Sequence, residues 1–196
     1  MSVVEGGAVV QRGKKLSKFA WIVGGTLFAA ASIAIHYQVK VVMHERSGAV
    51  QELRRVKVGQ PAPDFTLSDV DGKPVKLSSF GGRKAVLLDF WATWCAPCRM
   101  ALPDLQTLSD KYKDRGLEVL AIDQGESADQ VRYFLKRREY LLQFLLDPSS
   151  TVGDSYGVRG IPTSVLVDKD GFVQAIFVGI APERELERQV ELVTAN

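Results

Sequence analysis

AVLLDFWATWCAPCR, residues 85–99, is the stretch of sequence that decides the fold of this chain. It holds the two cysteines of the sequence, Cys95 and Cys98. A C-x-x-C pair alone leaves three interpretations open: a redox couple, two ligands of a metal site, or a chance spacing. The flanking residues favour the redox couple. Residues 86–91 form the continuous apolar run of a central parallel strand, and residues 100–112 carry apolar side chains at helical spacing, so the cysteines are expected at a strand-to-helix turn.

This turn is expected to give the two cysteines different chemistry. The first turn of a helix offers unpaired backbone N–H groups and the positive end of the helix dipole, which favour a thiolate over a thiol. Cys95 is therefore the predicted nucleophile. Cys98 lies three residues on and one turn deeper, and it is the predicted resolving thiol. Pro97 fits the helix start, because the N–H that proline lacks has no partner there.

The region from about Val58 to Val193 resembles the thioredoxin-fold thiol-disulfide oxidoreductases, most closely the membrane-anchored group around TlpA and ResA. Four positions besides the cysteines carry the resemblance. Asp89 stands where thioredoxins have a buried aspartate beneath the redox pair, and Pro103 stands where a proline kinks their active-site helix. Pro162, in the stretch RGIPT, matches the proline that follows a cis peptide bond in that fold, and Gly179 matches a glycine near the active-site surface.

The resemblance implies an α/β thioredoxin fold, with helices on both faces of a mixed central sheet. An N-terminal β-hairpin and a central βα insertion are expected to extend this fold, as in the TlpA group. Strands are expected at residues 65–68, 75–77, 85–91, 117–123, 144–146, 164–168 and 173–178. The active-site helix is expected to start at the cysteine pair, with Pro97 in its first turn, and to run to residue 112. Further helices are expected at residues 127–138 and 150–156 and from residue 182 onward.

The resemblance also implies roles for individual residues. Reduced Cys95 would attack a disulfide of a partner protein, and Cys98 would then release the partner. Asp89 would accept the proton of Cys98, because burial raises the pKa of a carboxyl group toward neutrality. Trp91 is expected inside the domain or close to the site. The residues expected to bind the substrate are Trp94, Pro97, Ile161 and Pro162.

One position departs from the TlpA and ResA group. Several members that act in cytochrome c maturation carry a glutamate three residues after the second cysteine, where this sequence has Ala101. The carboxylate is instead expected from Asp89. This difference weakens the specific prediction of an apocytochrome c substrate, so the sequence predicts a general dithiol reductase of protein disulfides. The link to cytochrome c maturation comes from the resemblance alone.

Other functions fit the sequence less well. A peroxiredoxin has threonine or serine three residues before its peroxidatic cysteine, where Ala92 precedes Cys95. A copper or zinc site needs further ligands, and the two histidines, His36 and His44, lie in or beside the apolar N-terminal segment. No metal or cofactor is therefore predicted. The alternative is a non-catalytic binding module, and the intact cysteine pair argues against it.

The N-terminal region is predicted to anchor the chain in a membrane. Residues 19–35 carry no charge and follow four basic residues between positions 12 and 18. A run of this length can cross a bilayer, and its basic flank is expected to stay in the cytoplasm. A cleaved signal peptide is the alternative, but the run exceeds the usual apolar core of such peptides. The expected organisation is a cytoplasmic segment at 1–18, an anchor at 19–42, a linker at 43–57 and the thioredoxin-like domain at 58–196.

The predicted topology places the domain outside the cytoplasm, where disulfides form and persist. Its expected partners are disulfide-containing extracytoplasmic proteins, a membrane electron donor and the lipids around the anchor. Nucleic acid is not an expected partner, because the net charge of the chain is only +2 and no basic run with interleaved aromatic residues occurs in the domain. The basic run at residues 136–138 is interpreted as the solvated end of a helix.

Overall fold

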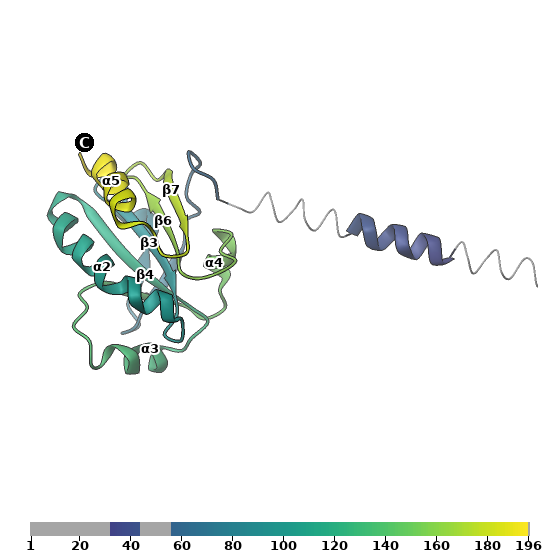
Figure 1. Cartoon of the computed structure of the whole chain (residues 1–196), viewed down its shortest axis with the longest axis horizontal. Helices are drawn as coiled ribbons and strands as arrows, with labels where there is room; N and C mark the ends of the chain where they lie inside the picture. The colour runs from purple at the N-terminus through teal and green to yellow at the C-terminus, as the bar shows by residue number, and fades with distance from the viewer. Residues whose placement is uncertain (1–31, 44–55, 196) are drawn as a thin grey trace, which may run out of the picture. The chain divides into compact units, whose positions relative to one another are not determined.

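The computed structural model describes residues 32–43 and 56–195 (Figure 1). The expected cytoplasmic segment at 1–18 lies outside the described residues, as do most of the linker and the first part of the expected anchor at 19–42. Residues 32–43 form a helix with exposed side chains. Within the described ranges, no helix combines the length and the apolar character that crossing a membrane requires.

A seven-stranded mixed sheet forms the centre of the domain. Its strands lie in the order β2-β1-β5-β4-β3-β6-β7. The central strand β3 pairs in parallel with β4 and antiparallel with β6, while β1 and β2 form the expected hairpin. The strands are β1 (Thr66–Asp69), β2 (Pro74–Lys76), β3 (Ala85–Trp91), β4 (Leu117–Gln124), β5 (Gln143–Asp147), β6 (Thr163–Val167) and β7 (Val173–Val178).

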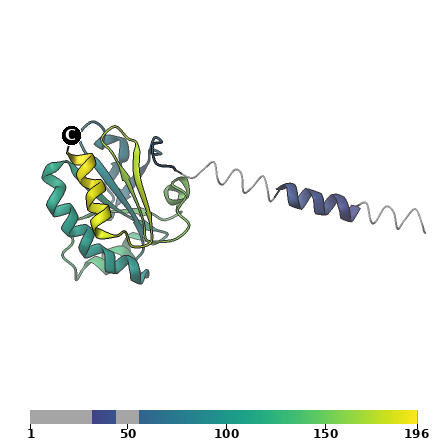
Figure 2. The same ribbon diagram turned by 45° about the horizontal axis from the view of Figure 1, so that its top comes forward.

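Helices cover both faces of this sheet, as the sequence predicted (Figure 2). Every residue of β3 is buried, and its side chains alternate between the two faces. Leu87 and Trp91 belong to the apolar cluster beneath α2 (Ala96–Tyr112), α3 (Ala128–Leu135) and α5 (Glu183–Thr194). Leu88 and Phe90 belong to the cluster on the opposite face, which includes residues of α4 (Thr151–Ser155) and of the 3-10 helix Leu77–Phe80. A second 3-10 helix, Lys113–Arg115, follows α2.

Several predicted boundaries differ from the observed ones, mostly by one residue, and two of these differences have a local cause. Leu77 begins a 3-10 helix instead of ending a strand, because the Ser78 N–H donates to the Asp64 carboxylate at 2.9 Å. The helix predicted over residues 127–138 starts at its Ser127 capping box but ends at Leu135. There the guanidinium of Arg138 donates to the Phe134 carbonyl and stacks on its ring at 3.8 Å, which satisfies the helix end.

Candidate active site

The two cysteines lie where β3 leads into α2, as the sequence predicted. Cys95 is the N-cap residue of α2, and Pro97 lies in the first helical turn. The backbone N–H of Cys98 donates to the Cys95 Sγ atom at 3.2 Å. This donor and the helix dipole would both stabilise negative charge on the Cys95 sulfur once the pair is reduced. The local structure therefore favours Cys95 as the thiolate.

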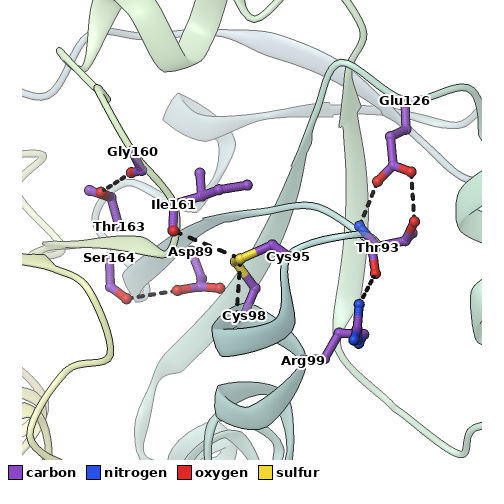
Figure 3. Close-up of a disulfide and its surroundings, with 10 residues drawn as sticks. All are labelled: Asp89, Thr93, Cys95, Cys98, Arg99, Glu126, Gly160, Ile161, Thr163 and Ser164. Atoms are coloured by element: carbon purple, nitrogen blue, oxygen red, sulfur yellow. Dashed lines mark hydrogen bonds between the residues drawn. A yellow bond between two sulfur atoms is a disulfide. The ribbon is translucent and has the colours of Figure 1, made fainter.

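Cys95 and Cys98 form a disulfide, and Figure 3 shows it at the centre of the site. Cys98 is fully buried, whereas Cys95 keeps 4% of its surface exposed. Trp94 is 66% exposed and Pro97 is exposed, so both lie at the surface next to the disulfide. Trp91 is fully buried. The cysteine that a partner protein can reach is therefore Cys95, next to an exposed apolar ring.

The loop before β6 approaches the disulfide from the other side. The peptide bond between Ile161 and Pro162 is cis, as expected. The carbonyl oxygen of Ile161 lies 3.8 Å from the Cys95 Sγ atom. Pro162 is buried, and Ile161 is partly exposed. Two segments that are 66 residues apart in the sequence thus meet at the reactive sulfur.

Asp89 lies in the middle of β3, on the face that α2 covers, and keeps only 1% of its surface exposed. It pairs with Ser164 across the antiparallel contact with β6, and the Ser164 hydroxyl donates to its Oδ1 atom at 2.7 Å. Its Oδ2 atom has no hydrogen-bond partner among the described residues. In the view of Figure 3 the carboxylate lies between Ser164 and the disulfide.

Burial raises the pKa of Asp89 from 3.8 to about 7, and the hydrogen bond from Ser164 opposes part of this rise. A carboxyl group with this pKa gains and loses a proton near neutral pH. Asp89 also lines a small cavity together with Ala101, Pro162 and Gly179. The strand thus supplies a carboxylate to the same cavity that Ala101 faces from the helix.

The sequence analysis missed a second carboxylate, Glu126, which is 6% exposed and follows β4. Its two oxygens accept hydrogen bonds from the Thr93 N–H at 2.5 Å and the Thr93 hydroxyl at 2.6 Å. The Thr93 carbonyl accepts a hydrogen bond from Arg99 at 2.8 Å. All three polar groups of Thr93, two residues before Cys95, are therefore held in place (Figure 3).

Glu126 is in turn positioned by Asp123, whose Oδ1 accepts the Glu126 N–H at 2.9 Å. Burial and the neighbouring Glu126 carboxylate raise the pKa of Asp123 far above its usual range. A signal for this cluster exists in the sequence. Because β3 and β4 are parallel and Trp91 pairs with Asp123, polar residues just after both strands meet at one edge of the sheet.

Comparison with known proteins agrees with this geometry. The model of the AhpC/TSA family matches residues 58–176. The chain is 35% identical to the thiol-disulfide oxidoreductase ResA of Bacillus cereus over 147 residues, which cover 75% of this chain and 84% of that protein. It is 37% identical to ResA of Geobacillus kaustophilus over 142 residues, covering 72% of this chain and 81% of the relative.

The chain belongs to the AhpC/TSA family and is a ResA-like thiol-disulfide oxidoreductase. The crystal structure of a thiol:disulfide interchange protein of the thioredoxin family from Chlorobium tepidum has the same fold, with a TM-score of 0.62 and 30% identity. The match covers 71% of this chain and 98% of the Chlorobium tepidum chain. The redox pair of this ResA-like enzyme is Cys95 and Cys98.

The raised pKa of Asp89 makes the stability of this ResA-like enzyme depend on pH. The folded protein keeps the Asp89 proton up to about pH 7, whereas the unfolded chain loses it near pH 3.8. The stabilising effect of this proton is complete below about pH 4 and is lost as the pH rises through 7. Since one pKa unit corresponds to about 1.4 kcal/mol, the loss amounts to about 4 kcal/mol at most.

Asp89→Asn should therefore gain stability relative to wild type as the pH rises, because asparagine cannot ionise. We expect the difference in the free energy of unfolding between variant and wild type to grow between pH 4 and pH 8. Urea denaturation of the oxidised proteins measures it. Asp71→Asn, which changes an exposed carboxylate in the β1–β2 turn, is the matched control. A difference that stays constant with pH would show that Asp89 is ionised throughout.

Proposed function

We propose that this oxidoreductase works as a reductase of disulfides in extracytoplasmic partner proteins. The observation that carries the proposal is the placement of Cys95 at the N-terminus of α2, with the buried Asp89 carboxyl group near the disulfide. A helix N-terminus provides a thiolate for attack, and a carboxyl group with a pKa near 7 provides a proton acceptor for the second step.

In the first step the Cys95 thiolate attacks one sulfur of the partner disulfide. A new bond forms between Cys95 and that sulfur, the partner's own S–S bond breaks, and the second partner sulfur leaves as a thiolate that takes up a proton. The Cys98 N–H, which donates to the Cys95 sulfur, and the helix dipole keep Cys95 ionised before the attack.

In the second step Cys98 resolves the mixed disulfide. Asp89 accepts the Cys98 proton, and the resulting thiolate attacks the Cys95 sulfur. The bond to the partner breaks, and the partner leaves with both of its sulfurs reduced. Two electrons have then passed to the partner, and Cys95 and Cys98 are left as a disulfide. A membrane electron donor would restore the dithiol.

Four residues are proposed to bind the partner segment. The exposed ring of Trp94 offers an apolar surface beside the reactive sulfur, and Pro97 lies exposed in the next turn. Ile161 and Pro162 flank the sulfur on the other side, where the backbone of a partner segment can pair with the loop. Because these residues lie on both sides of Cys95, an extended partner segment can contact them while it crosses the reactive sulfur.

The substrate is proposed to be a protein disulfide in general, with the haem-binding cysteines of an apocytochrome c as one special case. Ala101 supports the general case. This helix position supplies no carboxylate to the cavity that Asp89 lines from β3, where Asp104 and Glu183 are the other acidic lining residues. Cytochrome c maturation remains a narrower proposal that rests on the likeness to the ResA group.

The reductase assignment is tested by replacing each cysteine in the full chain. With dithiothreitol as electron donor, the wild type should reduce insulin disulfides, and Cys95→Ser should lose this activity entirely. Cys98→Ser should keep the attacking thiol but not the resolving one, so mixed disulfides should accumulate on Cys95 and identify the partners by mass spectrometry. Insulin reduction by Cys95→Ser at the wild-type rate would contradict the assignment of the reactive centre.

The domain is proposed to lie outside the cytoplasm, held by an anchor at residues 19–42. The uncharged run at 19–35 and its basic flank support this topology. Protease added to spheroplasts should digest the domain while a cytoplasmic marker stays intact. Protection of the domain would contradict the topology, and a mature protein that begins after Ala31 or Ala34 would contradict the anchor.

A further inference from the structure

A cavity of about 470 Å³ opens beside the active-site loop. Thr93 and Glu126 line it on the side of the reactive centre. Thr93 and Cys95 are two residues apart, so their Cα atoms lie within about 7 Å of each other. In the view of Figure 3, Thr93 and Glu126 lie on the side of Cys95 opposite to Ile161. A segment that crosses Cys95 from the Ile161 loop therefore runs toward this cavity.

The basic run at residues 136–138 lines the same cavity. Because α3 ends at Leu135, these three residues lie beyond the helix, and they line the cavity together with Thr93 of the active-site loop. Arg138 is engaged within the domain, where its guanidinium stacks on Phe134. Lys136 and Arg137 are exposed, and neither forms an ion pair with any carboxylate in the described part of the chain.

Glu126 and Gln130, which line the cavity, already have hydrogen-bond partners. Both oxygens of Glu126 accept hydrogen bonds from Thr93. The Gln130 side chain accepts from Ser127 in the capping box of α3. The nearby Asp129 carboxylate pairs with Arg132. Two cations of the cavity wall thus remain available, while the carboxylate inside it is held by the protein itself.

The aromatic side chains add an apolar surface to the cavity. Phe134 is buried and packs on Trp91, with ring centroids 5.3 Å apart, so it fixes this wall to the core. Tyr133 is 83% exposed. Tyrosine and arginine, the residue types of Tyr133 and Arg137, are both enriched in surfaces that bind other proteins. The volume of the cavity is within the range of pockets that hold small ligands.

We propose that this cavity binds an acidic segment of the partner protein, with Lys136 and Arg137 contacting aspartate or glutamate side chains a few residues from the attacked cysteine. The inference rests on the proposed reductase function and specifies the partner of the same site. A partner segment with carboxylates a few residues from its attacked cysteine is held at two points. One end lies at Ile161, and the carboxylates contact Lys136 and Arg137, so the partner disulfide is held in position for attack by Cys95. Partners without them are reduced more slowly.

The test compares two synthetic peptides, each with one internal disulfide and a three-residue tail of either glutamate or glutamine. With dithiothreitol as electron donor, the full chain in detergent should show a kcat/KM about threefold to tenfold higher for the glutamate peptide at low salt, as expected for two solvent-accessible ion pairs. Lys136→Gln combined with Arg137→Gln should bring the ratio near one, and 0.5 M salt should do the same in the wild type.

A matched variant controls for total charge. Lys73→Gln combined with Arg184→Gln removes two exposed cations that do not line the cavity, and it should keep the wild-type ratio. The proposal would be overturned if the wild type reduced both peptides with the same kcat/KM. It would also be overturned if the two double variants had the same ratio of kcat/KM for the two peptides. Loss of binding to anionic lipid vesicles in Lys136→Gln/Arg137→Gln, with an unchanged peptide ratio, would assign these cations to a membrane surface and also overturn it.

A small neutral disulfide, bis(2-hydroxyethyl) disulfide, separates this inference from the proposed function. It has no tail to reach the cavity, so all these proteins should reduce it at one rate. Failure of the wild type to reduce it would refute the reductase function itself. Normal reduction of the small disulfide without any glutamate preference would refute only the acidic partner segment.

Discussion

The Asp89 carboxyl group is buried at the centre of the sheet, and its hydrogen-bond partner among the described residues is Ser164. Burying an ionised carboxylate costs free energy, and this burial raises the pKa of Asp89 to about 7. The site depends on this constraint. The same burial that lowers the stability of the folded protein above neutral pH creates a proton acceptor near two thiols, which is the pattern expected where function opposes stability.

The rest of the fold brings chemical groups to this point from distant parts of the chain. The antiparallel pairing of β3 with β6 places Ser164 against Asp89 and brings the Ile161 loop to the cysteine sulfur. The parallel pairing of β3 with β4 brings Glu126 to Thr93 and thereby fixes the loop that leads into α2. The two neighbours of one central strand therefore position opposite sides of the reactive centre.

Local sequence patterns predicted the centre of the domain well. The limits of β3 and β7 are those expected from apolar residues between turn signals, and the helix start at the cysteines follows from the strand before it and Pro97 within it. The end of α3 could not be predicted in this way, because it depends on where the Arg138 side chain packs. The basic run was therefore interpreted as a solvated helix end, although it lines a cavity beside the site.

The contact between Glu126 and Thr93 was missed for a related reason. Each residue has ordinary neighbours in the sequence, and only the register between two strands shows that they meet. The positions of Asp89 and Pro162 were expected from the family resemblance, and the structure places them around one cavity.

The most direct measurement is the rate at which Cys98 resolves the mixed disulfide, followed by stopped-flow across neutral pH. In the wild type this rate should rise with pH through an inflection near 7, the pKa of Asp89. Ser164→Ala should move the inflection to higher pH, because the lost hydrogen bond lowers the pKa of Asp89 in the wild type. Asp89→Asn should remove the inflection and slow the step about a hundredfold at neutral pH. Identical profiles in all three proteins would contradict a role for Asp89 as the proton acceptor.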